Sequence, residues 1–267
     1  MVRDEVSFVV RSFEWIACAY FGYLVLACWL PPLSAWRRAG LIAASCLAGG
    51  AVWSIAHAAP PPVRDWAPLA YILAGYFLSG YLFAAPSPAI ESWLMGWDRR
   101  LLGDPRTRFA RGPRLLVAAL ELIYMGCFLL IPAGAAILIG TGRASQVDRY
   151  WTMVMGAEFA AFAPLAFIQT RPPWALERKP ELADPAIHRL ASHMVQHLTI
   201  RVNTFPSGHA AGSLAVALAV IGALPGTGLG LLALACAICV ACCVGRYHYV
   251  VDVVAGAAVA LVLWLAN

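Results

Sequence analysis

The stretch NTFPSGHAAGSLAVALAV, residues 203–220, joins a polar turn that contains a histidine to a long apolar run. Ser207 is a favourable N-cap residue, so the run is predicted to be a helix that begins at about Gly208. The free N–H groups and the positive dipole end of such a helix favour an anion beside its first turn. One wall of an anion site, suited to phosphate, is therefore predicted where an apolar helix begins.

The composition of the chain is that of an integral membrane protein. Of the 267 residues 61% are hydrophobic and 12% are charged, and the mean hydropathy is +0.73. Soluble domains contain about 25% charged residues. Because about 20 helical residues cross the hydrocarbon core, we predict an all-α, polytopic transmembrane helix bundle with about eight spans. The expected spans are 14–33, 40–58, 66–86, 114–139, 150–168, 208–224, 228–244 and 249–267.

A single integral membrane domain is expected over residues 1–267, with N-terminal spans in 1–86 and further spans in 114–267. The first apolar segment ends at Pro31-Pro32 without a small-residue cleavage site, so we interpret it as a retained span. The Gly- and Ala-rich segment 40–58 is compatible with a tilted or re-entrant helix. The net charge of +5 indicates contact with anionic membrane lipids and does not imply nucleic acid. The sequence carries no signal for an oligomeric state.

A long polar connection at 87–113 contains an expected amphipathic helix that lies in the membrane interface. Its apolar side chains are Trp93, Leu94, Trp97, Leu101 and Leu102. Asp98, Arg99 and Arg100 are expected on its water-facing side. The alternative is that this helix helps to bind an anionic substrate.

Several polar residues have both a functional and a structural interpretation. Glu121 and Glu158 lie inside expected spans, where a carboxylate either serves function or pairs with another helix, and the sequence does not decide between the two. His193 and His197 have metal-ligand spacing, but no carboxylate is placed as a third ligand, which favours an interfacial polar helix. Four cysteines in an apolar run are interpreted as small packing residues. They are Cys236, Cys239, Cys242 and Cys243.

A second motif is GRYHYVVDVVAG, residues 245–256. His248 and Asp252 are i and i+4 on a helix, so the carboxylate can accept an imidazole N–H and leave the other ring nitrogen as a base or nucleophile. Gly256, one turn further, is predicted to let another helix pack closely, and Arg246 adds positive charge at the membrane edge.

The two motifs are expected on one face of the membrane. Two spans, 208–224 and 228–244, separate the loops 169–207 and 245–248, so both loops emerge on the same side. Arg171, which precedes Pro172-Pro173, lies near the membrane boundary in the first of these loops. We therefore expect His209, His248 and Arg171 to converge.

The order Arg-Pro, Pro-Ser-Gly-His and His-x3-Asp resembles the type 2 phosphatidic acid phosphatase and vanadium haloperoxidase superfamily, whose membrane members are lipid phosphatases and phosphotransferases. The resemblance covers residues 114–267 and implies that they form a phosphatase-like catalytic core. The resemblance implies that His248 attacks phosphorus, that Asp252 holds His248 and that His209 protonates the departing alkoxide. It further implies phosphate binding by the residues Arg171, Ser207 and Gly208, without a metal or another cofactor.

The chain departs from the family pattern at two cationic positions. Pro164 stands where the first motif has lysine, and Ala241 and Cys242 stand where the third motif has Ser-Arg. Arg246 is the first choice for a replacement cation at the phosphate, ahead of Arg201 and Lys179.

Three functions are compatible with these residues. The first is a lipid phosphate phosphatase that hydrolyses a phosphomonoester or diphosphate headgroup through a phosphohistidine. A lipid phosphotransferase, similar to inositol phosphorylceramide synthases, is the alternative, and a non-catalytic lipid-binding protein is the third. The expected location is multi-pass in a membrane, the cell membrane in a bacterium. Fourteen Lys and Arg residues on the motif side against five opposite favour a cytoplasmic site, whereas the resemblance implies the outer face.

Overall fold

The computed structural model describes residues 9–103, 113–176 and 199–267, and these residues form an all-α structure without a β-strand. The prediction of an all-α fold is confirmed. The longer helices are α1 Ser12–Ala27, α2 Ala35–Ala58, α3 Pro61–Gly80, α4 Pro88–Leu102, α6 Arg114–Gly140, α7 Val147–Phe162, α10 Gly208–Ala223, α11 Pro225–Val244 and α12 Val250–Ala266. A single turn, α8 Pro173–Leu176, and two short 3-10 helices complete the described elements.

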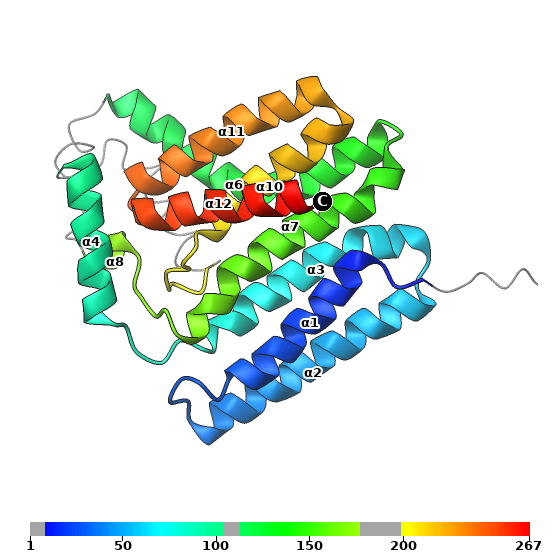
Figure 1. Ribbon diagram of the computed structural model, residues 1–267, viewed down its shortest axis with the longest axis horizontal. Helices are drawn as coiled ribbons and strands as arrows, with labels where there is room; N and C mark the ends of the chain where they lie inside the picture. Colours follow the sequence, from blue (N-terminus) through cyan, green and yellow to red (C-terminus); the bar gives the residue numbers. More distant parts are fainter. Residues whose placement is uncertain (1–8, 104–112, 177–198) are drawn as a thin grey trace, which may run out of the picture.

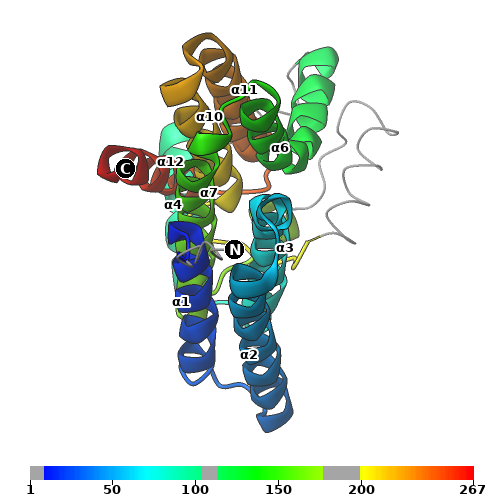
Figure 2. The same cartoon turned by 90° about the vertical axis from the view of Figure 1, so that its right-hand side faces the viewer.

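Helix α7 crosses the middle of the molecule and joins its two halves (Figures 1 and 2). It packs on α1 and α3 on one side and on α10 and α12 on the other. Helix α10 is the most enclosed element of the C-terminal half, because α6, α7, α11 and α12 all contact it. Its sequence is rich in Ala and Gly, and such small side chains let neighbouring helices approach closely.

Each of the eight expected spans overlaps a helix, but only some of these helices are long and apolar enough to cross a membrane. Helices α2, α6 and α11 are long and apolar enough to cross a membrane, while α1, α10 and α12 are apolar and shorter. Helix α2 runs without a break over 24 residues through the Gly- and Ala-rich segment. The count of eight spans stays a prediction.

A helix is present where the interfacial helix was expected, as α4, and its position in the membrane interface stays a prediction. Leu94 is fully buried and Trp93 is about half exposed (52%), as predicted for an amphipathic helix. Asp98, expected in water, is buried, so that part of the prediction is wrong. The reason is a tertiary contact, because Asp98 forms an ion pair with Arg246 in the loop between α11 and α12.

The N-terminal ends of α10 and α12 lie together because Gly256 leaves room for them. A Cβ at Gly256 would lie 2.6 Å from the carbonyl oxygen of Ser207 and 3.1 Å from Cβ of Ala210. The prediction that Gly256 allows close helix packing is thus confirmed. This contact brings the Pro-Ser-Gly-His turn against the first turns of α12.

Candidate functional site

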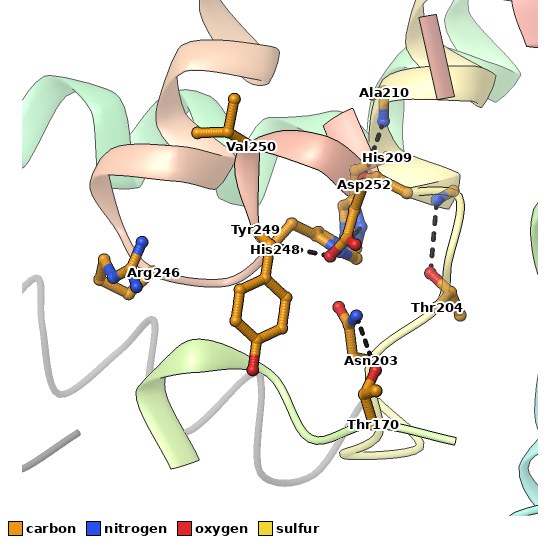
Figure 3. Close-up of polar contacts among 12 residues, drawn as sticks. Thr170, Asn203, Thr204, His209, Ala210, Arg246, His248, Tyr249, Val250 and Asp252 are labelled. Carbon is orange, nitrogen blue, oxygen red and sulfur yellow. Dashed lines mark hydrogen bonds and ion pairs between the residues drawn. The ribbon is translucent and has the colours of Figure 1, made fainter. Parts of the chain in front are cut away.

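Two histidines from different helix starts meet at the junction of α10 and α12 (Figure 3). Nδ1 of His209, in the first turn of α10, lies 3.2 Å from Nε2 of His248, in the loop before α12. On the other side of the His248 ring, Nδ1 lies 3.6 Å from Oδ2 of Asp252. The structure therefore brings together the three residues that the sequence motifs placed in catalytic roles.

The surroundings of His248 favour a neutral ring with a defined tautomer. Burial lowers the pKa of His248 to about 3, so the imidazole keeps a lone pair at neutral pH. A proton on Nδ1 faces Asp252, which leaves Nε2 to accept a hydrogen bond from Nδ1–H of His209. The 3.6 Å contact to Asp252 is longer than a hydrogen bond, as is common in catalytic sites without substrate. This arrangement can present a nucleophilic nitrogen beside a proton donor.

Asp252 is held by the backbone on both sides of it. Its Oδ2 accepts a hydrogen bond from the N–H of Tyr249 at 3.0 Å, and its carbonyl accepts one from the N–H of Ser207 at 2.9 Å. The side chain of Asn203 points toward the same carboxylate and donates to Oγ1 of Thr170 at 3.0 Å (Figure 3). Rotating the Asn203 amide by half a turn gives both its oxygen and Oδ1 of Asp252 a partner. Asn203 therefore completes the support of the Asp252 carboxylate.

Aromatic rings fix the plane of His209. Tyr124 of α6 stacks on the His209 ring with centroids 5.0 Å apart, and the Tyr247 ring stacks on Tyr124 with centroids 3.7 Å apart. Phe128 meets the His209 ring edge-on at 5.6 Å. Sequence reasoning did not identify these residues or Asn203, because only the tertiary packing of α6 and the 199–207 segment places them here.

The predicted N-cap is present at the start of α10. Oγ of Ser207 accepts a hydrogen bond from the N–H of Ala210 at 3.3 Å, and the N–H of Gly208 donates to Oγ1 of Thr204 at 3.4 Å. Ser207 is fully buried, whereas Gly208 and His209 line a cavity. Gly208 and His209, together with Ser213 one turn further, are therefore the residues of α10 that face the cavity.

The cavity has a volume of about 310 Å³ and reaches from the histidines into the space between α3, α6 and α7. Its apolar wall includes Leu69, Ile72, Leu73, Cys127, Phe128, Ile131, Pro132 and Phe162. The polar residues His209, His248 and Arg201 line it too, and Glu158 of α7 contributes a carboxylate to the wall. An elongated apolar molecule with one anionic end fits such a lining.

Arg171 is near the cavity but is bound to helix α4. Its guanidinium donates to both oxygens of Glu91, at 3.0 and 2.8 Å, and its backbone N–H donates to Glu91 Oε1 at 2.8 Å. This contact lowers the pKa of the Glu91 carboxyl and raises the pKa of Arg171. The next residue, Pro172, lines the cavity, while Arg171 is not part of the described lining. The predicted role of Arg171 in binding phosphate stays a prediction.

Arg246, the first choice for a replacement cation, lies apart from the two histidines (Figure 3). Its Nη1 donates to Oδ2 of Asp98 at 2.7 Å, both side chains are buried, and Arg246 is absent from the described lining. Cys242, at the family's arginine position, is buried in α11. Among the described lining residues the basic side chain is Arg201, which was a later choice. Lys179, His193 and His197 lie outside the described residues.

Glu158 and Glu121, which the sequence left undecided, have different positions. Glu158 lines the cavity, whereas Glu121 is buried on α6 and is not in the described lining. Within residues 9–103, 113–176 and 199–267, no three His, Cys, Asp or Glu side chains are grouped as a metal site would require. A metal-free site therefore stays a prediction.

A comparison with protein families gives a match over most of the chain. A family model described as the PAP2 superfamily matches residues 92–266, which is more than half of the chain. The matched region begins inside α4, so it includes Asp98 as well as the two histidine motifs. Searches of curated proteins and of solved structures found no match.

Proposed function

The chain belongs to the PAP2 superfamily, and from this premise we propose that it is a multi-pass membrane lipid phosphatase that acts through a phosphohistidine on His248. The observation that carries the proposal is the position of His209, His248 and Asp252 at one end of an apolar cavity. The cavity suits the apolar part of a lipid, and the histidines suit a phosphoryl group at its end.

The first half of the reaction transfers the phosphoryl group to the protein. Nε2 of His248 attacks phosphorus and forms the P–N bond, and the bond from phosphorus to the lipid oxygen breaks. The negative phosphate favours an imidazolium on His209, and this group gives its proton to the departing oxygen. Asp252 stabilises the positive charge that develops on the His248 ring through its Nδ1–H.

The second half restores the free protein. A water molecule loses a proton to His209 and attacks phosphorus, and the P–N bond breaks to release inorganic phosphate and neutral His248. The phosphate must first replace the 3.2 Å hydrogen bond between the two imidazoles, since both rings use the nitrogens that face the site. The sum of the two halves is hydrolysis of one phosphate ester by one water.

In this proposal several groups supply the positive charge that stabilises the bound phosphate. Arg201 and the first turn of α10, at Gly208, line the cavity directly. Arg171 reaches the phosphate by exchanging Glu91 for a phosphate oxygen, which its 43% exposed side chain permits. Arg246 remains bound to Asp98 and positions the loop that carries His248. Arginine and helix N–H groups supply this stabilisation without a metal.

The proposal is tested by phosphate release from a panel of lipid phosphates by detergent-purified protein, with chelator present and beside His248→Ala. We expect release by the wild type and a loss of at least about 1,000-fold in the variant, because no other group replaces the nucleophile. Asp252→Asn is expected to fall between the two. Release that His248→Ala leaves unchanged contradicts the proposed mechanism.

The same samples separate hydrolysis from headgroup transfer. A phosphotransferase gives a new phospholipid when an acceptor alcohol is added, with little free phosphate, and depends equally on His248. Hydrolysis gives phosphate in amounts equal to the lipid alcohol. If lipid phosphate is consumed without release of an equal amount of inorganic phosphate, the protein is a phosphotransferase and the phosphatase proposal is rejected.

A further inference from the structure

Glu158 is a buried acidic side chain in the wall of the cavity that the proposed mechanism does not use. It lies on α7, it is 7% exposed, and it lines the cavity together with His209 and His248. Within the described part of the chain, no group donates a hydrogen bond to its carboxylate and no cationic side chain forms an ion pair with it. The carboxyl group therefore faces the space where a ligand would lie.

The neighbouring helix leaves room for this carboxyl group. A Cβ at Gly208 would lie 3.1 Å from Oε2 of Glu158, and a Cβ at Gly212 would overlap Oε1. These two glycines are one turn apart on α10, so the side of the helix against Glu158 consists of backbone alone. The carboxyl group therefore occupies room that depends on the absence of side chains at Gly208 and Gly212.

The position of the carboxyl group relative to His209 defines which part of a substrate it meets. Gly208, which the carboxyl group approaches, is the residue before His209 at the start of α10, and Glu158 and His209 line the same cavity. In the proposed function His209 contacts the leaving oxygen of the lipid. Glu158 is then placed next to the few bonds that follow this oxygen, between the phosphate and the apolar chains.

A carboxyl group in this position favours a polar neighbour. Burying a polar group without a hydrogen-bond partner is unfavourable, and sites built around such groups discriminate strongly against ligands that leave them unpaired. Glycerol- and sphingoid-based lipids carry hydroxyl, amide or ester groups within a few bonds of the phosphate. A polyprenyl or simple alkyl phosphate carries only hydrocarbon there.

We propose that Glu158 is a specificity-determining residue that hydrogen-bonds the polar backbone of a glycerol- or sphingoid-based lipid phosphate and disfavours polyprenyl phosphates. The inference rests on the proposed function, because that function places the leaving oxygen at His209. It narrows the substrate from any lipid with an exposed phosphate to lipids with a hydrogen-bonding group beside that phosphate.

The test compares oleoyl lysophosphatidate with oleyl phosphate, which share the phosphate and an 18-carbon chain type but differ in the polar backbone. We expect the wild type to prefer lysophosphatidate in kcat/KM by on the order of 100-fold. Glu158→Met, which keeps the length of the side chain, is expected to reduce this preference at least tenfold, while Glu158→Gln retains most of it because an amide still hydrogen-bonds.

A binding measurement keeps this test separate from the test of hydrolysis. On the His248→Ala background the two lipids are compared by the thermal stabilisation they give in detergent, which reports their relative Kd. A binding preference that depends on Glu158, without phosphate release by the wild type, supports the inference and rejects the phosphatase function. The inference is overturned if the wild type does not prefer lysophosphatidate over oleyl phosphate, or if Glu158→Met leaves that preference unchanged.

A second variant displaces the Glu158 carboxyl group without substituting Glu158 itself. Gly212→Ala forces Glu158 to move, so we expect it to reduce the preference for lysophosphatidate as Glu158→Met does. Gly230→Ala in α11 is the matched control, because a Cβ there meets nothing within 4 Å. A Gly212→Ala protein that stays folded and keeps the full preference also contradicts the role of Glu158.

Discussion

Helices α4 and α7 both carry carboxylates toward the site, but only those of α4 have arginine partners among the described residues. Glu91 and Asp98, two turns apart on α4, bind Arg171 and Arg246. Glu158 on α7 faces the cavity and has no such partner within the described chain. The difference indicates that the α4 carboxylates hold the segments that surround the site, whereas the α7 carboxylate is available to a ligand.

The pair on α4 that is most buried gives the largest expected effect on stability. Asp98→Ala removes the carboxylate that neutralises Arg246, and with it the acceptor of the Val250 N–H at 2.9 Å. Removal of one partner of a buried ion pair costs about 3–5 kcal/mol of unfolding free energy. Thermal unfolding in detergent measures this loss.

Arg99→Ala is the matched control for this prediction, because Arg99 is the next residue on α4 and is exposed. It should change the unfolding free energy by less than about 0.5 kcal/mol. An Asp98→Ala protein as stable as the Arg99→Ala protein would mean that the α4 contact is not structural, and the comparison between α4 and α7 would fail.

Arg201, in the cavity wall, is expected to matter more for substrate binding than Arg246, which is bound to Asp98 of α4. Arg201→Gln should raise KM about 10- to 100-fold, since hydrogen bonds to charged groups contribute about 1.5–3 kcal/mol. Glutamine keeps a Cβ, so the strain of the positive φ of 57° is unchanged. Steady-state kinetics with lysophosphatidate measures the effect, and Arg246→Gln is the comparison.

The comparison gives an outcome that would reverse this assignment. A KM that rises in Arg246→Gln and not in Arg201→Gln would show that the phosphate is bound by Arg246, the first choice from the sequence. It would also mean that substrate displaces Asp98 from Arg246.

The helices and the two histidine motifs could be predicted from the sequence because they depend on local patterns. Apolar runs located the helices, the N-cap at Ser207 located the start of α10, and Gly256 indicated a close helix contact. The i, i+4 spacing of His248 and Asp252 correctly indicated that the two side chains meet, but the prediction that both lie on one helix is wrong, because α12 begins at Val250 and His248 lies in the loop before it.

The partners of charged residues could not be predicted, because they join segments far apart in the chain. Asp98 and Arg246 are 148 residues apart, and nothing local to α4 shows that Asp98 turns inward. Glu158 had two open interpretations for the same reason, since its lack of a described partner depends on where α3, α6 and α10 lie. Tyr124 likewise reaches His209 only through the packing of α6.

The pair of Glu91 and Arg171 gives the smallest expected effect and tests whether Arg171 exchanges partners. Glu91 is buried, but the Arg171 side chain is 43% exposed, so solvent screens the pair and its contribution lies at the upper end of the range for surface ion pairs, which is about 0–1 kcal/mol. Glu91→Gln removes this contribution. If the Arg171 guanidinium leaves Glu91 to bind phosphate, this variant makes the exchange easier and lowers KM by up to about fivefold, with little change in stability.

The variant Arg171→Gln is the partner measurement, and it should raise KM and abolish the effect of Glu91→Gln in the double variant. This non-additivity follows because Glu91 acts on the substrate only through the Arg171 guanidinium. An unchanged KM in both single variants would show that Arg171 stays bound to Glu91 of α4 throughout the reaction. The carboxylates of α4 would then be wholly structural, and Glu158 would be the one acidic side chain of this comparison that meets the substrate.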